Sequence, residues 1–64
     1  MILVNGEPHD AEGLSVQALV ERMVREPRGI AVALDGEIVR RSEWPSTIVH
    51  EGARIEIVTA AAGG

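Results

Sequence analysis

The apolar and polar residues of this chain fall into blocks that predict several strands and one helix. A short apolar run over residues 1–4 is followed by Asn5-Gly6, the dipeptide most typical of a two-residue β-hairpin turn, because both positions tolerate positive φ. We therefore expect a hairpin over residues 1–10. Pro8 has no backbone N–H to donate, so its strand should lie at the edge of the sheet.

The next block has the spacing of an amphipathic helix. Ser15 is a residue type that caps helix N-termini, and the apolar residues after it recur at helical spacing. They are Val16, Leu19, Val20, Met23 and Val24. Pro27 and Gly29 are typical of the segment that follows a helix. We expect a helix from Ser15 to shortly before Pro27, with this apolar stripe packed on the sheet.

Three further strands are expected after the helix. Residues 30–34 form an apolar run, Asp35-Gly36 is a second hairpin signal, and residues 37–41 form the returning strand. A short helical turn is expected near residues 46–49. The last strand covers residues 53–59, where apolar and charged residues alternate as in a half-buried strand.

The predicted element order is β-β-α-β-β-β. The first and last strands can pair in parallel at the centre of a mixed sheet of about five strands, with the helix on one face. This α+β arrangement is the β-grasp, or ubiquitin-like, fold. We expect one domain over residues 1–59 and a flexible C-terminal tail over residues 60–64, because nothing in the tail sequence would hold it down.

Composition favours a carrier or binding module over an enzyme. The chain has 64 residues, and a domain of this size buries only about 60% of its unfolded surface, which leaves no room for a large substrate cleft. It contains no cysteine, which excludes disulfides, thiol catalysis and thiolate metal sites. All six basic residues are arginine, so the chain cannot form isopeptide bonds through a lysine of its own.

Charge and hydropathy exclude two classes of partner. The formal net charge is −4, and no basic patch typical of nucleic-acid binding is visible. No apolar run approaches the length of a membrane span, and no signal peptide is recognisable. We expect a cytoplasmic protein that contacts neither nucleic acid nor membrane. His9 and His50 have no sequence spacing that pairs them with carboxylates, so we expect no metal site.

The candidate chemistry lies in the tail, which ends in Ala62, Gly63 and Gly64. Two glycines let an extended tail enter a narrow enzyme tunnel and approach a nucleotide without side-chain clash. The terminal carboxylate of Gly64 is then the reactive group. A carboxylate is a poor electrophile until it is activated, so a partner must supply ATP and Mg²⁺. We expect no cofactor bound by the chain itself.

Three segments of the sequence match a known family: residues 29–44, GIAVALDGEIVRRSEW, the later Glu51-Gly52, and residues 55–58, IEIV. Through these segments and the terminal Gly-Gly, the whole chain resembles the ThiS family of thiamine-biosynthesis sulfur carriers. Two positions depart from the family pattern. Asp35 stands where the family often has Asn, and Ala53 stands where it often has Asp. Neither position lies in the tail.

The resemblance implies a reaction sequence for the tail. A ThiF-like adenylating enzyme would activate the carboxylate of Gly64, and a persulfide from a cysteine desulfurase system would convert it to a thiocarboxylate. A ThiG-like thiazole synthase would then take the sulfur for the thiazole ring of thiamine. Three alternatives stay open: a carrier resembling the small subunit of molybdopterin synthase, a ubiquitin-like protein modifier, and a binding module with an inert tail.

A docking surface for these partners is expected on the sheet face opposite the helix. If Ile2, Val4, Val32, Leu34, Ile38, Ile55 and Ile57 face the helix, then small or apolar residues occupy the other face: Leu3, Ala31, Ala33, Val39 and Val58. An exposed apolar sheet face beside a reactive tail is suited to docking an activating enzyme. Gly63 and Ala62 would contact the same partners.

Overall fold

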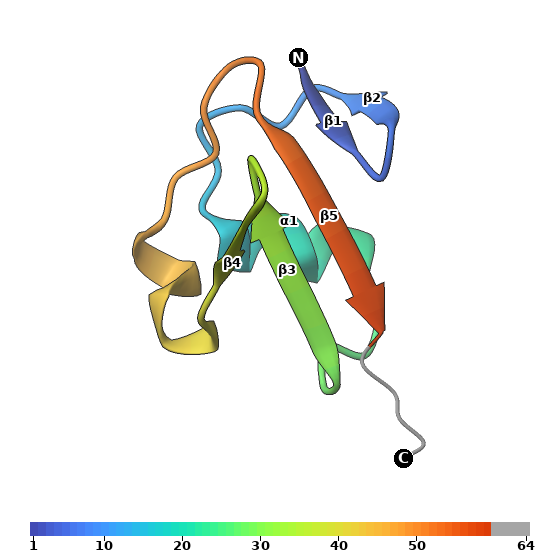
Figure 1. Cartoon of the computed structure of the whole chain (residues 1–64), viewed down its shortest axis with the longest axis vertical. Helices are drawn as coiled ribbons and strands as arrows, with labels where there is room; N and C mark the ends of the chain where they lie inside the picture. Colours follow the sequence, from blue (N-terminus) through green and yellow to red (C-terminus); the bar gives the residue numbers. More distant parts are fainter. Residues whose placement is uncertain (60–64) are drawn as a thin grey trace.

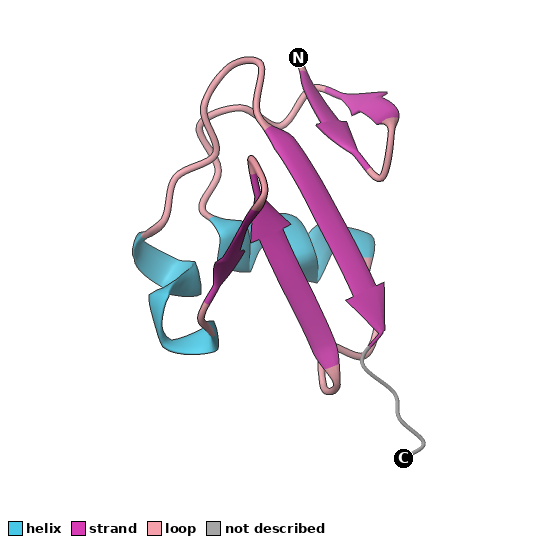
Figure 2. Ribbon diagram, in the orientation of Figure 1, coloured by secondary structure: helices cyan, strands magenta, loops and turns pink. Residues whose placement is uncertain are grey.

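The computed structural model describes residues 1–59, which form one mixed sheet, one α-helix and one short 3-10 helix (Figure 1). In chain order the elements are β1 (Ile2–Val4), β2 (Glu7–His9), α1 (Val16–Met23), β3 (Ile30–Leu34), β4 (Glu37–Val39), η1 (Arg41–Ser46) and β5 (Arg54–Thr59). Figure 2 shows α1 crossing one face of the sheet, with η1 at the side of the sheet beyond β4.

The sheet order is β2-β1-β5-β3-β4, with β1 and β5 parallel and the other neighbours antiparallel. The predicted β-grasp architecture is therefore confirmed, including the parallel pairing of the first and last strands. β5 is the central strand. Pro8 lies in the edge strand β2, where its missing N–H costs no ladder hydrogen bond.

Both predicted hairpin turns are present and have the same backbone shape. Asn5 and Gly6 have φ of 51° and 85°, and Asp35 and Gly36 have φ of 51° and 88°. Positive φ at both central residues is the type I′ turn, whose twist matches that of the flanking strands. The turns set the registers Val4↔Glu7 and Leu34↔Glu37 at the ends of the paired strands.

Helix α1 begins at the predicted cap. The Ser15 hydroxyl accepts a hydrogen bond of 3.0 Å from the backbone N–H of Ala18, which satisfies one free donor of the first turn. The helix ends at Met23, earlier than expected, because Val24 already has extended backbone. Met23 is 37% exposed, so its expected place in the apolar stripe is wrong.

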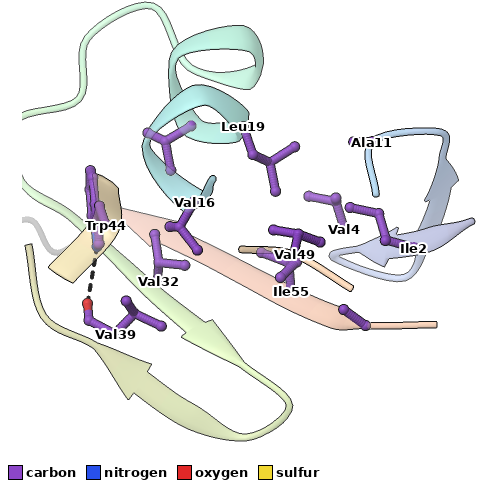
Figure 3. Close-up of a cluster of buried hydrophobic side chains, with 12 residues drawn as sticks. Ile2, Val4, Ala11, Val16, Leu19, Val32, Val39, Trp44, Val49 and Ile55 are labelled. Carbon is purple, nitrogen blue, oxygen red and sulfur yellow. Dashed lines mark hydrogen bonds between the residues drawn. The ribbon is translucent and has the colours of Figure 1, made fainter. Parts of the chain in front are cut away.

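The core lies between α1 and the sheet (Figure 3). The helix contributes Val16, Leu19 and Val20, and the central strands contribute Ile2, Val4, Val32 and Ile55, all nearly or fully buried. Val49 and Ala53 close the core from the loop before β5. The aliphatic character of this layer agrees with a chain that contains a single aromatic residue.

The predicted facing of β4 is wrong, and the hairpin register explains why. A two-residue turn pairs Leu34 with Glu37, and hence Ala33 with Ile38 and Val32 with Val39. Directly paired residues share a face of the sheet. Val39 therefore lies with Val32 on the core side and is 9% exposed, whereas Ile38 lies on the opposite side and is 72% exposed.

The segment after β4 also differs from expectation. The strand stops at Val39 instead of continuing to Arg41, and the helical turn covers Arg41–Ser46 instead of 46–49. The cause is Trp44, which is 2% exposed and donates its indole N–H to the carbonyl of Val39 over 3.0 Å (Figure 3). The chain has to fold back directly after Val39 to make this contact. The Arg41 guanidinium covers the ring at 4.5 Å from its centroid.

Candidate docking face and C-terminal site

We call the sheet face opposite α1 the outer face. It carries a shallow hollow. β5 supplies every second residue to it, since side chains alternate along a strand. Its side chains are Leu3 of β1, Ala31 and Ala33 of β3, Ile38 of β4, and Arg54, Glu56 and Val58 of β5. Asn5 and Gly6 of the first turn also line the hollow.

The hollow exists because its floor is made of small side chains. Ala33 lies between Glu56 and Ile38, with which it pairs, and Ala31 pairs with Val58, so each alanine has a larger side chain beside it. Ile38 and Val58 are 72% and 56% exposed. Large exposed aliphatic groups around a small-residue floor can accept an apolar side chain of a partner and bury it from water.

The predicted docking residues are mostly where the sequence put them. Leu3, Ala33 and Val58 line the hollow, as does Ala31. Val39 does not, because it is buried on the core side. Ile38 takes its place on the outer face. The two-residue turn implies this exchange, because it pairs Ala33 with Ile38 and Val32 with Val39. Arg54, Glu56 and Asn5 were not anticipated as lining residues.

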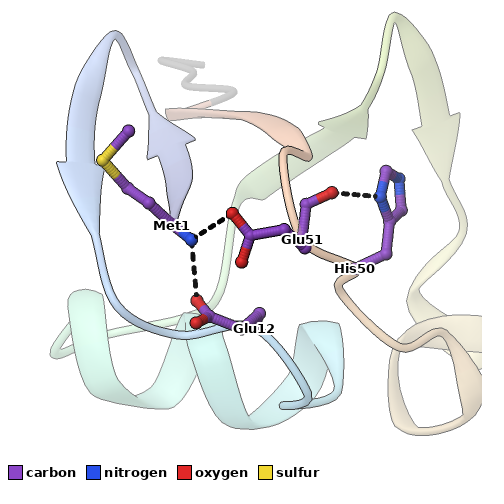
Figure 4. A network of polar contacts seen from close by, with 4 residues as sticks. All are labelled: Met1, Glu12, His50 and Glu51. Carbon is purple, nitrogen blue, oxygen red and sulfur yellow. Dashed lines mark hydrogen bonds and ion pairs between the residues drawn. The ribbon is translucent and has the colours of Figure 1, made fainter.

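A polar network occupies the end of the sheet where β5 begins. The amino group of Met1 forms ion pairs with Glu51 and, over 3.3 Å, with Glu12 (Figure 4). The hydrogen bond to Glu51 is the main cause that raises the pKa of this amino group above 8.0. The pKa of Glu12 is lowered, first by its own backbone N–H and then by the amino group.

His50 belongs to the same end of the molecule. Its Nε2 lies 2.8 Å from Oδ2 of Asp35, and its Nδ1 lies 2.9 Å from the carbonyl oxygen of Glu51 (Figure 4 shows the latter). Both partners are acceptors, so the doubly protonated ring satisfies them together. The carboxylate of Asp35 is the main cause that raises the pKa of His50 above 6.5. The pKa of Asp35 is lowered, first by the backbone N–H of Arg54 and second by His50.

This polar network holds separate segments of the chain together. It joins the N-terminus, the turn after β3 and the loop before β5, and it lies at the end of the sheet opposite Thr59, where β5 finishes (Figure 1). Within residues 1–59 no group of three or more His, Asp or Glu side chains is arranged to hold a metal ion. In the same range no helix is long and apolar enough to cross a membrane.

The predicted reactive residues lie outside this range. Ala62, Gly63 and Gly64 belong to the segment 60–64, which falls outside the described residues. The described part therefore contributes the outer face and the strand from which that segment continues. β5 ends at Thr59, and the residue before Thr59 is Val58, which lines the hollow of the outer face.

Comparison with known proteins gives a consistent set of relatives. The sequence model of the ThiS family matches residues 2–64. Sulfur carrier protein ThiS of Thermus thermophilus is 34% identical over 64 residues, covering 100% of both chains. The crystal structure of the thiamine biosynthesis protein ThiS from Geobacter metallireducens is 31% identical, with a TM-score of 0.85 over 98% of this chain and 97% of that one. A thiazole synthase of Magnetococcus marinus is 33% identical in an alignment 64 residues long that covers 98% of this chain and 20% of that protein.

Proposed function

The chain belongs to the ThiS family, and from that premise we propose that it carries sulfur as a thiocarboxylate on Gly64. Its relatives are named as a sulfur carrier and as a thiamine biosynthesis protein, and this chain has the same carrier role, in which it is the sulfur donor and not the enzyme. The observation that carries the finer proposal is the extent of the family match, which continues through Gly63 and Gly64.

The chemistry requires only the carboxylate of Gly64 from this chain. One carboxylate oxygen attacks the α-phosphate of ATP, and pyrophosphate leaves with the help of Mg²⁺ bound by the activating enzyme. The terminal sulfur of a persulfide then attacks the acyl carbon and displaces AMP. A thiol then attacks the donor's cysteine sulfur in the resulting acyl disulfide, forms a new disulfide with that sulfur and releases the acyl-bound sulfur. The product is a thiocarboxylate on Gly64.

The partners follow from the chemistry and from one relative. A ThiF-like adenylating enzyme docks on the outer face and receives the tail, and a cysteine desulfurase system supplies the persulfide. A ThiG-like thiazole synthase accepts the sulfur. The similarity to part of a thiazole synthase chain supports this acceptor, because a carrier-like segment is there joined covalently to the synthase. Since activation consumes ATP, we place the carrier in the cytoplasm.

Adenylation gives a direct test. Purified chain, a ThiF-like enzyme, Mg²⁺ and ATP should exchange labelled pyrophosphate into ATP, and a variant lacking Gly64 should not. Its shortened tail withdraws the carboxylate by about 3.4 Å, and a misplacement of about 1 Å already costs up to about a hundredfold in rate. Ile48→Ala leaves the tail intact and changes an exposed side chain outside the hollow, so it serves as the control that should keep exchange. Exchange that persists without Gly64 would sink the proposal.

The acceptor is tested separately. The thiocarboxylate form is mixed with a thiazole synthase or with the large subunit of molybdopterin synthase, and loss of the thiocarboxylate is followed with time. We expect turnover with the thiazole synthase alone. Turnover with the molybdopterin synthase subunit alone would assign the chain to the alternative carrier class.

A further inference from the structure

The first residues of the two hairpin turns both bind the backbone of β5. Asn5 and Asp35 have the same φ of 51°. Oδ1 of Asp35 accepts a hydrogen bond of 2.9 Å from the N–H of Arg54, at the start of β5. The Asn5 amide makes two bonds to Ile57, further along the strand: Oδ1 accepts from its N–H over 2.9 Å, and Nδ2 donates to its carbonyl over 3.1 Å.

The Asn5 side chain takes the place of a missing residue of β1. β1 pairs with β5 only at Leu3↔Arg54 and Val4↔Ile55, and the backbone N–H of Asn5 then donates to the carbonyl of Ile55 over 2.9 Å. Beyond that point the first turn carries the chain away. In a strand the N–H and C=O of residues two apart point to the same edge, so Ile57 presents its pair where β1 has ended. A carboxamide has the same donor and acceptor as a peptide group and satisfies both.

These two hydrogen bonds to Ile57, which we call the Asn5 bridge, lie two residues before the described end of β5 at Thr59. On the other edge β3 accompanies β5 to its end, where Ile30 pairs with Thr59. Asn5 also lines the hollow of the outer face together with Val58. The Asn5 side chain therefore borders the hollow of the proposed docking surface and also bonds to β5 near its described end.

We propose that Asn5 is a positioning residue for activation of Gly64: its amide holds the C-terminal half of β5 in the sheet and so fixes the point and direction from which the tail continues. This inference rests on the proposed function. Residues 60–64 continue from Thr59, so a displacement of the end of β5 relative to the outer face displaces the starting point from which Gly64 must reach the active site of the docked enzyme. Adenylation needs the reacting atoms within about 3.5 Å, and small misplacements are costly.

Asn5 could instead serve the turn alone, and one substitution separates the two roles. Asn5→Gly keeps a residue that adopts positive φ and removes the bridge. Asn5→Asp keeps the acceptor for the N–H of Ile57 and loses the donor. Asp35→Gly is the matched control: it changes the equivalent residue of the other turn and removes a contact to the start of β5 instead of its end.

Hydrogen exchange of the isolated chain tests the bridge without any enzyme. In Asn5→Gly the amide of Ile57 should exchange about tenfold faster, which corresponds to loss of one or two exposed hydrogen bonds. The amide of Val58 points toward β3, so its exchange should stay within about twofold. Asp35→Gly should leave the exchange rate of the Ile57 amide unchanged and should speed exchange of the Arg54 amide. Unchanged exchange at Ile57 in Asn5→Gly would overturn the proposal.

Steady-state adenylation by a ThiF-like enzyme tests the positioning role, at a temperature where all variants are folded by circular dichroism. For Asn5→Gly we expect kcat to fall about tenfold and KM for the carrier to change less than kcat, because the large apolar groups of the hollow, Ile38 and Val58, are kept while tail placement is lost. The kcat of Asn5→Asp should lie between the values of Asn5→Gly and the wild type. Asp35→Gly should keep the wild-type kcat.

Two results would contradict this role. Wild-type kcat in Asn5→Gly, with fast exchange at Ile57, would show that the bridge does not govern placement. An equal loss of kcat in Asp35→Gly would show a general effect of destabilisation. A wild-type chain that is not adenylated at all would instead overturn the proposed function, and the role of Asn5 in that reaction with it.

Discussion

Asp35 shows how much a single turn residue contributes in this molecule. Its φ of 51° suits the turn, Oδ1 accepts from the N–H of Arg54, and Oδ2 lies 2.8 Å from His50. The turn conformation could be predicted from Asp35-Gly36, because local chemistry decides it. The contact with His50 could not, because it depends on the path of the loop before β5, which no periodic pattern describes.

The pair of Asp35 and His50 predicts a pH dependence of stability. The folded state raises the pKa of His50 above 6.5, so it binds the proton more tightly than the unfolded chain does. The resulting stabilisation is complete below pH 6.5 and is lost as the pH rises through the folded pKa. We expect the melting temperature, measured by thermal circular dichroism, to fall as the pH rises above 6.5 and through the folded pKa of His50.

His50→Gln is the control for this pH dependence. It keeps a side-chain donor for Asp35 but cannot titrate, so its melting temperature should fall less over the same range. The Met1 amino group, whose pKa is raised above 8.0, remains in both proteins and accounts for change at higher pH. The same slope in both proteins would show that His50 does not cause it.

At the scale of elements, the hairpin of β3 and β4 decides which residues form the outer face. The sequence marks both strands and the turn between them. Which face of the sheet Ile38 and Val39 occupy depends on the two-residue turn, because the turn sets the pairing of β4 with β3. The end of β4 was beyond sequence reasoning, because the buried contact of Trp44 with the Val39 carbonyl overrides the β-propensity of the residues that follow.

The outer face gives a prediction with a matched control. Ile38 lies in the hollow and is 72% exposed, whereas Ile48 lies in the loop before β5, outside the hollow, and is 54% exposed. Ile38→Ala should weaken binding to the activating enzyme by about tenfold, because the apolar area that binding buries is smaller. Ile48→Ala removes the same atoms elsewhere and should leave the dissociation constant within about twofold.

Isothermal titration calorimetry of both variants measures this difference. Neither side chain is part of the buried core, so both variants should melt near the wild type. Equal weakening by the two substitutions, or none by Ile38→Ala, would place the docking surface away from the outer face.

At the scale of the whole molecule, the fold was the most predictable feature. Two Gly-containing turns, one helical stripe and alternating strands fix the element order, and a β-grasp follows because β1 and β5 then pair in parallel. The reactive site stays a prediction, because Gly64 lies outside the described residues: the sequence has no cysteine and no recognisable catalytic constellation, which directs the hypothesis to the C-terminal carboxylate. In the proposed function the described domain supplies the docking face, and Gly64 is the group on which the partners act.

The most direct test of this account is the mass of the protein and of its C-terminal fragments after reaction with ATP, Mg²⁺, a ThiF-like enzyme and a persulfide donor. The account predicts replacement of one oxygen by sulfur, located on Gly64, with the melting temperature unchanged when Gly64 is deleted. A chain that keeps its original mass, or that becomes joined to lysines of other proteins, would contradict it.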